Sequence, residues 1–324
     1  MKNYKQLLFL KLLPGIGSST INKIYVPLIQ KEIGFDNLVR EVFSRETRLS
    51  EKILKEKRAA AEEKADAICN NADIKIITVF DSEYPAGFKE LGDKKPPFFY
   101  VRGNAELLNI SGIAVIGTRH PSALTKKNGL DVVKKIIAAS NGKTIISGLA
   151  LGCDKIGHNA ALQTKTPTVA VLPSGFNKIA PAPHKKLAET IVNEGGCLLS
   201  EYEPDEIVTK FSYVQRDTLT AALSSGIFVL ECGVESGTMH TVKAGDKLKR
   251  ILAAWKPEVS KSEEDKSEET DGDFAGNMLM IEEYYACSLT SDEDIAGFIA
   301  AVDVPKVKED EGKLDKSVQS TLPF

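Results

Sequence analysis

One short pattern recurs along this chain: an apolar run, then a turn of glycine and small residues, then a helical segment. The most informative copy is Gly112–Arg119, in which Ile113 to Ile116 are all apolar and Gly117-Thr118-Arg119 follow directly. A short run that is apolar at every position is typical of a strand buried on both faces, as in parallel sheets. The helical pattern that comes next has Ser122 as its candidate N-cap.

Three further copies have the same order of strand and turn: Lys143–Ser147 before Gly148–Cys153, Thr168–Leu172 before Pro173-Ser174-Gly175, and Gly226–Glu231 before Ser236-Gly237-Thr238. Parallel strands that alternate with helices bring such turns to one edge of the sheet, where open α/β sheets bind ligands. The sequence therefore predicts an α/β fold with a Rossmann-like, doubly wound, mostly parallel sheet.

The turn at Gly117-Thr118-Arg119 is the first candidate binding site. A strand, a small-residue turn and a helix N-terminus together present backbone N–H groups, which suit a phosphate. Arg119 would add a planar guanidinium with two parallel donors, and the alternative is a surface arginine paired with a carboxylate. Thr118 either donates its hydroxyl to the same phosphate or caps the helix.

Asp154 and His158 are four residues apart on one predicted helix, so their side chains can face each other. One interpretation is a general acid–base pair. The other is structural, with Asp154 capping the helix and a buried His158 bracing the turn. We favour the structural interpretation because no nucleophile stands at a matched spacing.

Lys210 and Phe211 fall in a predicted loop, Asp205–Tyr213, and Arg216 falls in the first turn of a predicted helix, Val214–Leu223. Two cations around an aromatic ring suit stacked bases with phosphates alongside. Alternatively, Phe211 belongs to the core and both cations are solvated. The residues alone leave both interpretations open.

The chain divides into four predicted parts. Residues 1–71 form a small helical domain with a helix-hairpin-helix layout, and residues 72–111 are an extended lead-in that joins the sheet. Residues 112–302 form the Rossmann-like core, which ends in a helix over Ser291–Val302 capped by Ser291. An acidic segment, 256–273, and a polar tail, 303–324, are predicted to be disordered because they hold too few apolar residues to fold.

The charge distribution agrees with a partner that carries phosphates. The 324 residues have a formal net charge of -3, yet residues 1–255 hold 35 Lys and Arg against 27 Asp and Glu. Such a mildly basic body with an acidic end is compatible with phosphate binding. The five cysteines are scattered and lack CxxC spacing, which favours reduced thiols in the cytoplasm over disulfides or a metal site. We expect no membrane span.

Four stretches of the sequence resemble the DNA-processing protein A family, also called DprA or Smf: Ile116-Gly117-Thr118-Arg119, Ser147–Asp154 with His158, Ala170–Gly175, and Ser236-Gly237-Thr238. The resemblance covers roughly residues 8 to 302. It implies a Rossmann-like core that binds single-stranded DNA, forms a homodimer and helps to load a RecA-type recombinase during natural transformation. In this family the histidine signature is largely architectural.

The resemblance also favours contacts from Lys210, Phe211 and Arg216. We predict no catalytic residue, no metal and no cofactor. The residues predicted to contact phosphates or bases are Gly117, Thr118, Arg119, Ser147, Gly148, Ser174, Gly175, Lys210, Phe211, Arg216, Ser236, Gly237 and Thr238.

The sequence departs from the family at two places. Leu151 stands where relatives carry a basic residue, and Val214-Gln215-Arg216 stands where they carry Arg-Asn-Arg, so phosphate-binding charge is lost. The alternative function is a nucleotide-binding protein or a nucleoside-monophosphate phosphoribohydrolase on the same kind of pocket. Those enzymes carry a catalytic Glu in Gly-Gly-x-Gly-Thr-x-x-Glu, and Thr241 occupies the comparable position here, which disfavours hydrolysis.

Overall fold

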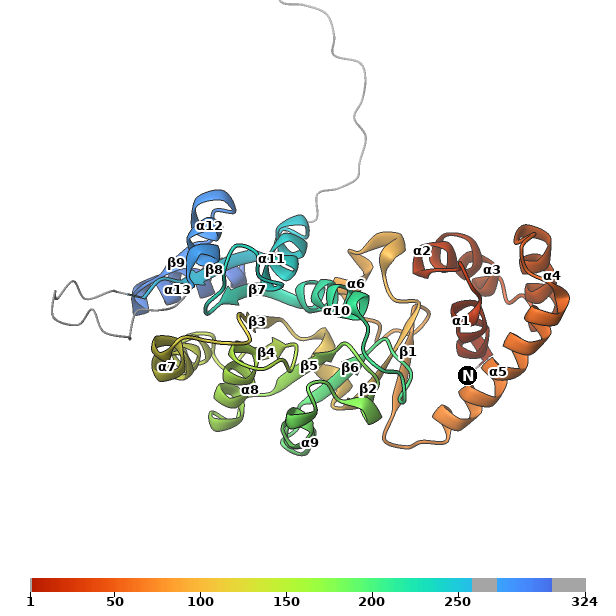
Figure 1. The fold of residues 1–324 in the computed structure, drawn as a ribbon, viewed down its shortest axis with the longest axis horizontal. Helices are drawn as coiled ribbons and strands as arrows, with labels where there is room; N and C mark the ends of the chain where they lie inside the picture. Colours follow the sequence, from red (N-terminus) through yellow and green to blue (C-terminus); the bar gives the residue numbers. More distant parts are fainter. Residues whose placement is uncertain (1, 258–272, 305–324) are drawn as a thin grey trace, which may run out of the picture.

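The computed structural model describes residues 2–257 and 273–304. Apart from their end residues, the predicted disordered segments 256–273 and 303–324 lie outside the described residues. The described part holds a central sheet, helices on both of its faces, and a lobe of helices at one end (Figure 1).

A nine-stranded sheet runs through the described residues in the order β1-β2-β6-β5-β4-β3-β7-β8-β9. Its strands are β1 (Lys75–Thr78), β2 (Phe98–Gly103), β3 (Gly112–Ile116), β4 (Thr144–Ser147), β5 (Thr168–Leu172), β6 (Cys197–Ser200), β7 (Ser224–Val229), β8 (Ile251–Trp255) and β9 (Cys287–Leu289). The seven strands from β3 to β9 pair in parallel, and β1 and β2 are antiparallel additions at one edge. The predicted doubly wound, mostly parallel sheet is confirmed.

Strand β3 shows why the sheet is covered on both faces. All five of its residues are buried, and successive side chains alternate between the faces. Ile113 and Val115 pack in one core with α7 (Ala123–Ala139), α8 (Cys153–Gln163) and α13 (Asp292–Asp303). Ala114 and Ile116 pack in another core with α10 (Lys210–Leu223), α11 (Thr238–Lys247) and α12 (Ala275–Glu283). Figure 1 shows α7 and α8 on one side of the sheet and α10 and α11 on the other.

Shorter elements complete the sheet's surroundings. Helix α6 (Ala86–Lys89) shares a core with β2 and α10, and α9 (Lys185–Asn193) packs on β6 and β5. Short 3-10 helices occur at η2 (Gly92–Lys94), η3 (Ala105–Asn109), η4 (Phe176–Lys178) and η5 (Ala182–His184). The last two separate β5 from α9, so the β5 turn, unlike those after β3 and β4, does not lead directly into an α-helix.

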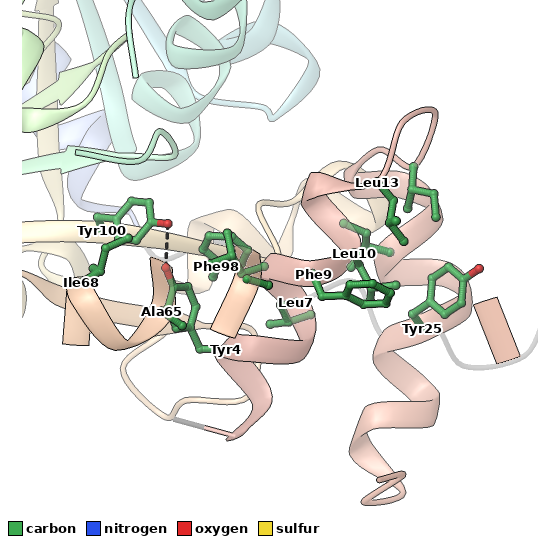
Figure 2. Packing of buried hydrophobic residues seen from close by; sticks show 14 of the residues in the cluster. Tyr4, Leu7, Phe9, Leu10, Leu13, Tyr25, Ala65, Ile68, Phe98 and Tyr100 are labelled. Atoms are coloured by element: carbon green, nitrogen blue, oxygen red, sulfur yellow. Dashed lines mark hydrogen bonds between the residues drawn. The ribbon is translucent and has the colours of Figure 1, made fainter. Parts of the chain in front are cut away.

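The N-terminal lobe is helical, as predicted. Its elements are α1 (Lys2–Leu12), α2 (Ser18–Thr20), the π-helical turn η1 (Ile21–Tyr25), α3 (Val26–Gln30), α4 (Phe35–Arg45) and α5 (Glu51–Cys69). Its core is built from large side chains that are almost fully buried, among them Leu7, Phe9, Leu10 and Tyr25 (Figure 2). The chain between α1 and α2 turns at Gly15, whose φ of +80° suits glycine.

This lobe shares its core with the sheet. The Tyr4 ring on α1 meets the Phe98 ring on β2 edge to face, with centroids 5.1 Å apart. The hydroxyls of Tyr4 and Tyr100 form a buried hydrogen bond of 2.9 Å, drawn as a dashed line in Figure 2. The helical lobe therefore packs directly on β2. The division of the chain at residue 71 stays a prediction.

Candidate nucleic-acid interface

The turns after β3, β4 and β7 meet at the carboxyl edge of the sheet and line a cleft of about 510 Å³ together with α10. This is the edge at which open α/β sheets bind ligands. Ligand pockets commonly have volumes of about 300–1,000 Å³. The lining residues are Ile116, Gly117, Thr118, Arg119, His120, Ala150, Asp154, Lys210, Tyr213, Val214, Arg216, Asp217, Ser236, Gly237, Thr238, His240 and Thr241.

The N-terminus of α7, which follows the β3 turn, is already occupied by a carboxylate. Ser122 is the N-cap of α7, as predicted, and its hydroxyl accepts from the N–H of Thr125 at 3.2 Å. Buried Glu231 accepts from the Ser122 N–H at 3.0 Å and from the Ser122 hydroxyl at 2.8 Å. Its carbonyl accepts from the Thr118 N–H at 2.7 Å. The expected phosphate cradle therefore lacks these N–H groups, because Glu231 takes them.

Arg119 remains available for a ligand. It is exposed, and its guanidinium carbon lies 4.8 Å from the centroid of the Tyr213 ring, in a cation–π contact. Within residues 2–257 and 273–304, Arg119 forms no ion pair, so no described carboxylate holds it in the way that the alternative interpretation required. The Thr118 hydroxyl accepts from the His120 N–H at 3.2 Å and does not cap the helix, which Ser122 does.

Asp154 holds the turn after β4 in place. It was predicted to cap α8, but the N-cap is Gly152, with φ of +75°, and Asp154 is the second helical residue. One oxygen of Asp154 accepts from the backbone N–H groups of Gly148 and Ala150, each at 3.1 Å. A Cβ at Gly152 would lie 2.3 Å from the carbonyl oxygen of Thr118, so the turns after β3 and β4 are in close contact.

Arg216 lies in the floor of the cleft and is 6% exposed. Its Nη1 is 3.5 Å from Asp154 Oδ2, and its Nε is 3.3 Å from Asp217 Oδ1. The guanidinium packs directly on Gly148, where an added Cβ would lie 0.9 Å from Nη1. Two carboxylates thus balance this charge inside the protein, which makes Arg216 a brace between α10 and the β4 turn.

The hydrogen bond of His158 is made with Thr168 and not with Asp154. Its ring is fully buried, and Nδ1 is 2.8 Å from the hydroxyl of Thr168. Because that hydroxyl donates to the carbonyl of Ile145 at 2.8 Å, it accepts from His158, which assigns the proton to Nδ1. Burial lowers the pKa of His158 from 6.5 to about 3. Both members of the conceivable acid–base pair are therefore engaged inside the protein, in line with the structural interpretation.

A pH dependence of stability follows from His158. Its folded-state pKa is below its unfolded value, so the unfolded chain binds the proton first. The stabilisation that neutral His158 gives to the folded state is fully present above about pH 6.5. It is lost as the pH falls toward 3, at about 1.4 kcal/mol per pH unit. From pH 7 to pH 5 the loss is about 2 kcal/mol.

Urea unfolding of the wild type and of His158→Asn at both pH values measures this loss. Asparagine keeps a side-chain N–H for Thr168 and does not titrate, so the difference between the two pH values should shrink by about 2 kcal/mol in the variant. An equal difference in both proteins would contradict the assignment.

The structure gathers eight of the predicted contact residues at the cleft: Gly117, Thr118, Arg119, Lys210, Arg216, Ser236, Gly237 and Thr238. The remaining five do not line it. Ser147 and Ser174 are fully buried, and Ser147 donates to the carbonyl of Val115 at 2.6 Å. Gly148 is covered by Arg216, and a Cβ at Gly175 would lie 1.9 Å from the carbonyl oxygen of Glu203. Phe211 is 81% exposed and lies outside the cleft.

Lys210 and Phe211 are helical rather than in a loop. Thr209 and Ser212 form a reciprocal capping box, which begins α10 at Lys210. Lys210 is exposed and, like Arg119, forms no ion pair in the described part of the chain. Of the two family departures, Val214 lines the cleft, and Leu151 lies in a small adjoining hollow with Arg119 and Tyr213.

Several residues of the site were not predicted: Tyr213, Asp217, Glu231, His120 and His240. Glu231 is the last residue of a predicted strand. Residues at the carboxyl ends of parallel strands meet at one edge of the sheet, so Glu231 could have been selected on the same ground as Arg119. Tyr213 and Asp217 could have been found only by beginning the helix at Lys210, since they then lie one turn apart on one face. Burial raises the pKa of the Asp217 carboxyl, and the charge of Arg216 opposes this.

No cluster of three or more His, Cys, Asp or Glu side chains that could hold a metal ion occurs among the described residues. None of the helices in the described ranges is long and apolar enough to cross a membrane.

The parallel order, the helices on both faces and a ligand cleft at the carboxyl edge define a Rossmann-like α/β protein. Residues 75–299 match the family described as DNA recombination-mediator protein A, and the chain belongs to this family. The DNA processing protein DprA of Streptococcus pneumoniae is 36% identical over 165 residues, 51% of this chain and 57% of that protein. Protein Smf of Escherichia coli is 34% identical over 148 residues, 46% of this chain and 39% of that protein.

The chain spans about half the length of these curated relatives. Two solved structures match more of it. The X-ray structure of DprA from Streptococcus pneumoniae superposes with a TM-score of 0.70 at 25% identity, covering 92% of this chain and 98% of that one. DprA from Helicobacter pylori, whose structure concerns a single-stranded DNA binding mode, superposes with a TM-score of 0.58 at 26% identity, covering 70% of this chain and 96% of that one. The predicted resemblance to the DprA family is confirmed.

Proposed function

We propose that this chain binds single-stranded DNA in the cleft at the carboxyl edge and acts in DNA processing. The observation that carries the proposal is the pair of exposed cations at the cleft, Arg119 and Lys210, which form no ion pair among the described residues. Such cations bind phosphates, and phosphate contacts supply most of the affinity for a nucleic acid. The Helicobacter pylori relative, which binds single-stranded DNA, supports the same function here.

The finer proposal is that the chain acts as a homodimer, delivers the strand to a RecA-type recombinase and serves natural transformation. It rests on membership of the recombination-mediator family. The chain needs no catalytic group for this role. Thr241, in the cleft, replaces the carboxylate of the phosphoribohydrolase motif, and Asp154 and His158 are both bound within the fold. Binding rather than hydrolysis is therefore the better match.

The test compares a labelled oligothymidine with a hairpin duplex of equal charge by fluorescence anisotropy. The single strand should bind about tenfold more tightly, because exposed bases offer stacking that a duplex hides. Equal affinity for the duplex would contradict the proposal. Nucleoside monophosphates in a parallel assay address the alternative, since release of a free base from them would favour the hydrolase.

A further inference from the structure

Asp217 is an unexpected group in a cleft whose exposed charges suit phosphates. It lies on α10, lines the cleft and has a side chain that is 14% exposed. Its only ion-pair partner in the described ranges is Arg216, at 3.3 Å, and neither of its oxygens accepts a hydrogen bond there. A carboxylate in this position repels a phosphate and accepts hydrogen bonds from donors.

The positive charge of Arg216 is shared between Asp217 and a second carboxylate. Arg216 also lies 3.5 Å from Asp154, so one guanidinium serves two carboxylates in the floor of the cleft. Burial raises the pKa of the Asp217 carboxyl and the nearby Asp154 adds to this, whereas Arg216, His240 and Arg119 oppose it. The lining of the cleft therefore places two carboxylates beside one buried guanidinium, and it also holds the exposed cations Arg119 and Lys210.

This arrangement of charges suits one part of a DNA strand in particular. Within a strand, the phosphodiester and the deoxyribose have no N–H or O–H donors, so only a base can donate to Asp217. Tyr213 and Asp217 lie one helical turn apart on α10 and both line the cleft, with Arg119 over the Tyr213 ring. A nucleotide whose phosphate met Arg119 or Lys210 would place its base in the same cleft as the carboxylate.

We propose that Asp217 accepts hydrogen bonds from the N–H edge of a nucleobase and that this contact favours guanine. The inference rests on the proposed function and adds base recognition at one position of the bound strand. Guanine presents two adjacent donors, N1–H and the 2-amino group, which match the two oxygens of a carboxylate. Thymine has a single N–H between two carbonyl oxygens, and these repel the carboxylate.

The experiment measures the affinity of the full chain for three oligonucleotides of equal length. One is all thymidine, one carries isolated guanines between thymidines, and one carries hypoxanthine in place of each guanine. Hypoxanthine lacks only the 2-amino group, so it removes one of the two donors. We expect the guanine strand to bind about fivefold more tightly than oligothymidine, with the hypoxanthine strand between them.

Asp217→Asn should abolish the preference, because an amide presents one donor in place of an acceptor. It should bind oligothymidine at least as tightly as the wild type, which also shows that the variant is folded. Glu235→Gln is the matched control: Glu235 is exposed beside Ser236 and does not line the cleft, so its loss should leave the preference intact.

Equal affinity of the wild type for all three strands would overturn the inference and leave the proposed function standing. A guanine preference that persists in Asp217→Asn would also overturn it. Failure of every strand to bind would overturn the proposed function itself, and base recognition with it.

Discussion

Arg216→Ala should lower the free energy of unfolding by about 3 kcal/mol, because it leaves a buried carboxylate pair without its cation. Arg216 is 6% exposed, lies within 3.5 Å of both Asp154 and Asp217, and covers the backbone at Gly148. Its removal also frees the turn after β4 from α10. DNA affinity should therefore fall through loss of geometry, although Arg216 offers little surface to a phosphate. Urea unfolding and anisotropy on the same preparation measure the two effects.

Lys210→Ala is the matched control, since it removes an exposed cation from the same helix and touches no buried carboxylate. It should leave the unfolding free energy within about 0.5 kcal/mol of the wild type. A stable Arg216→Ala protein that loses only DNA affinity would show that Arg216 is a phosphate ligand, as the sequence predicted, rather than a brace.

Arg119→Ala should weaken binding of single-stranded DNA at least about tenfold, because a hydrogen bond to a charged group contributes about 1.5–3 kcal/mol. The loss should be the same for every sequence, since a phosphate carries no sequence information. Stability should hardly change, because the side chain is exposed and contacts the Tyr213 ring without an ion pair in the described residues. Anisotropy with oligothymidine and a thermal melt check both parts.

Arg119→Lys separates charge from shape at this position. Lysine keeps the charge but cannot reproduce two parallel donors, so it should recover only part of the affinity. Full recovery would mean that Arg119 acts as a point charge. Unfolding of Arg119→Ala would mean that the arginine stabilises the fold.

The architecture could be predicted because its signals are local. Gly112–Ile116 is apolar at every position, which identified a central strand, and Ser122 and Ser291 precede helices that they do cap. The turns that follow parallel strands must meet at one edge of the sheet. This rule placed Arg119, Ser236 and Gly237 together without any knowledge of the fold.

The parts that could not be predicted depend on contacts between distant segments. Glu231 closes the N-terminus of α7 from the end of another strand, more than a hundred residues away. Asp154 was expected to cap its own helix, but its oxygen accepts from the preceding loop and meets Arg216 of α10. Whether a polar side chain hydrogen-bonds to the backbone of its own helix or to that of a distant segment depends on the tertiary fold.

The start of α10 was missed for a more local reason. Thr209 and Ser212 form a reciprocal cap, a weaker signal than the usual pairing of Ser or Thr with Glu or Gln. Beginning the helix four residues late hid the shared face of Tyr213 and Asp217. Ser147 and Ser174 were expected to contact a ligand because they adjoin the turns, yet each is fully buried.

The most direct test of the account is the salt dependence of oligothymidine binding in the wild type, Arg119→Ala and Lys165→Gln. Lys165 is an exposed cation that follows α8, at the opposite edge of the sheet from the cleft. If Arg119 binds a phosphate, its loss should reduce the slope of log affinity against log salt by about 0.7, and Lys165→Gln should keep the wild-type slope. An unchanged slope in Arg119→Ala, or an equal reduction in both variants, would contradict the placement of DNA in this cleft.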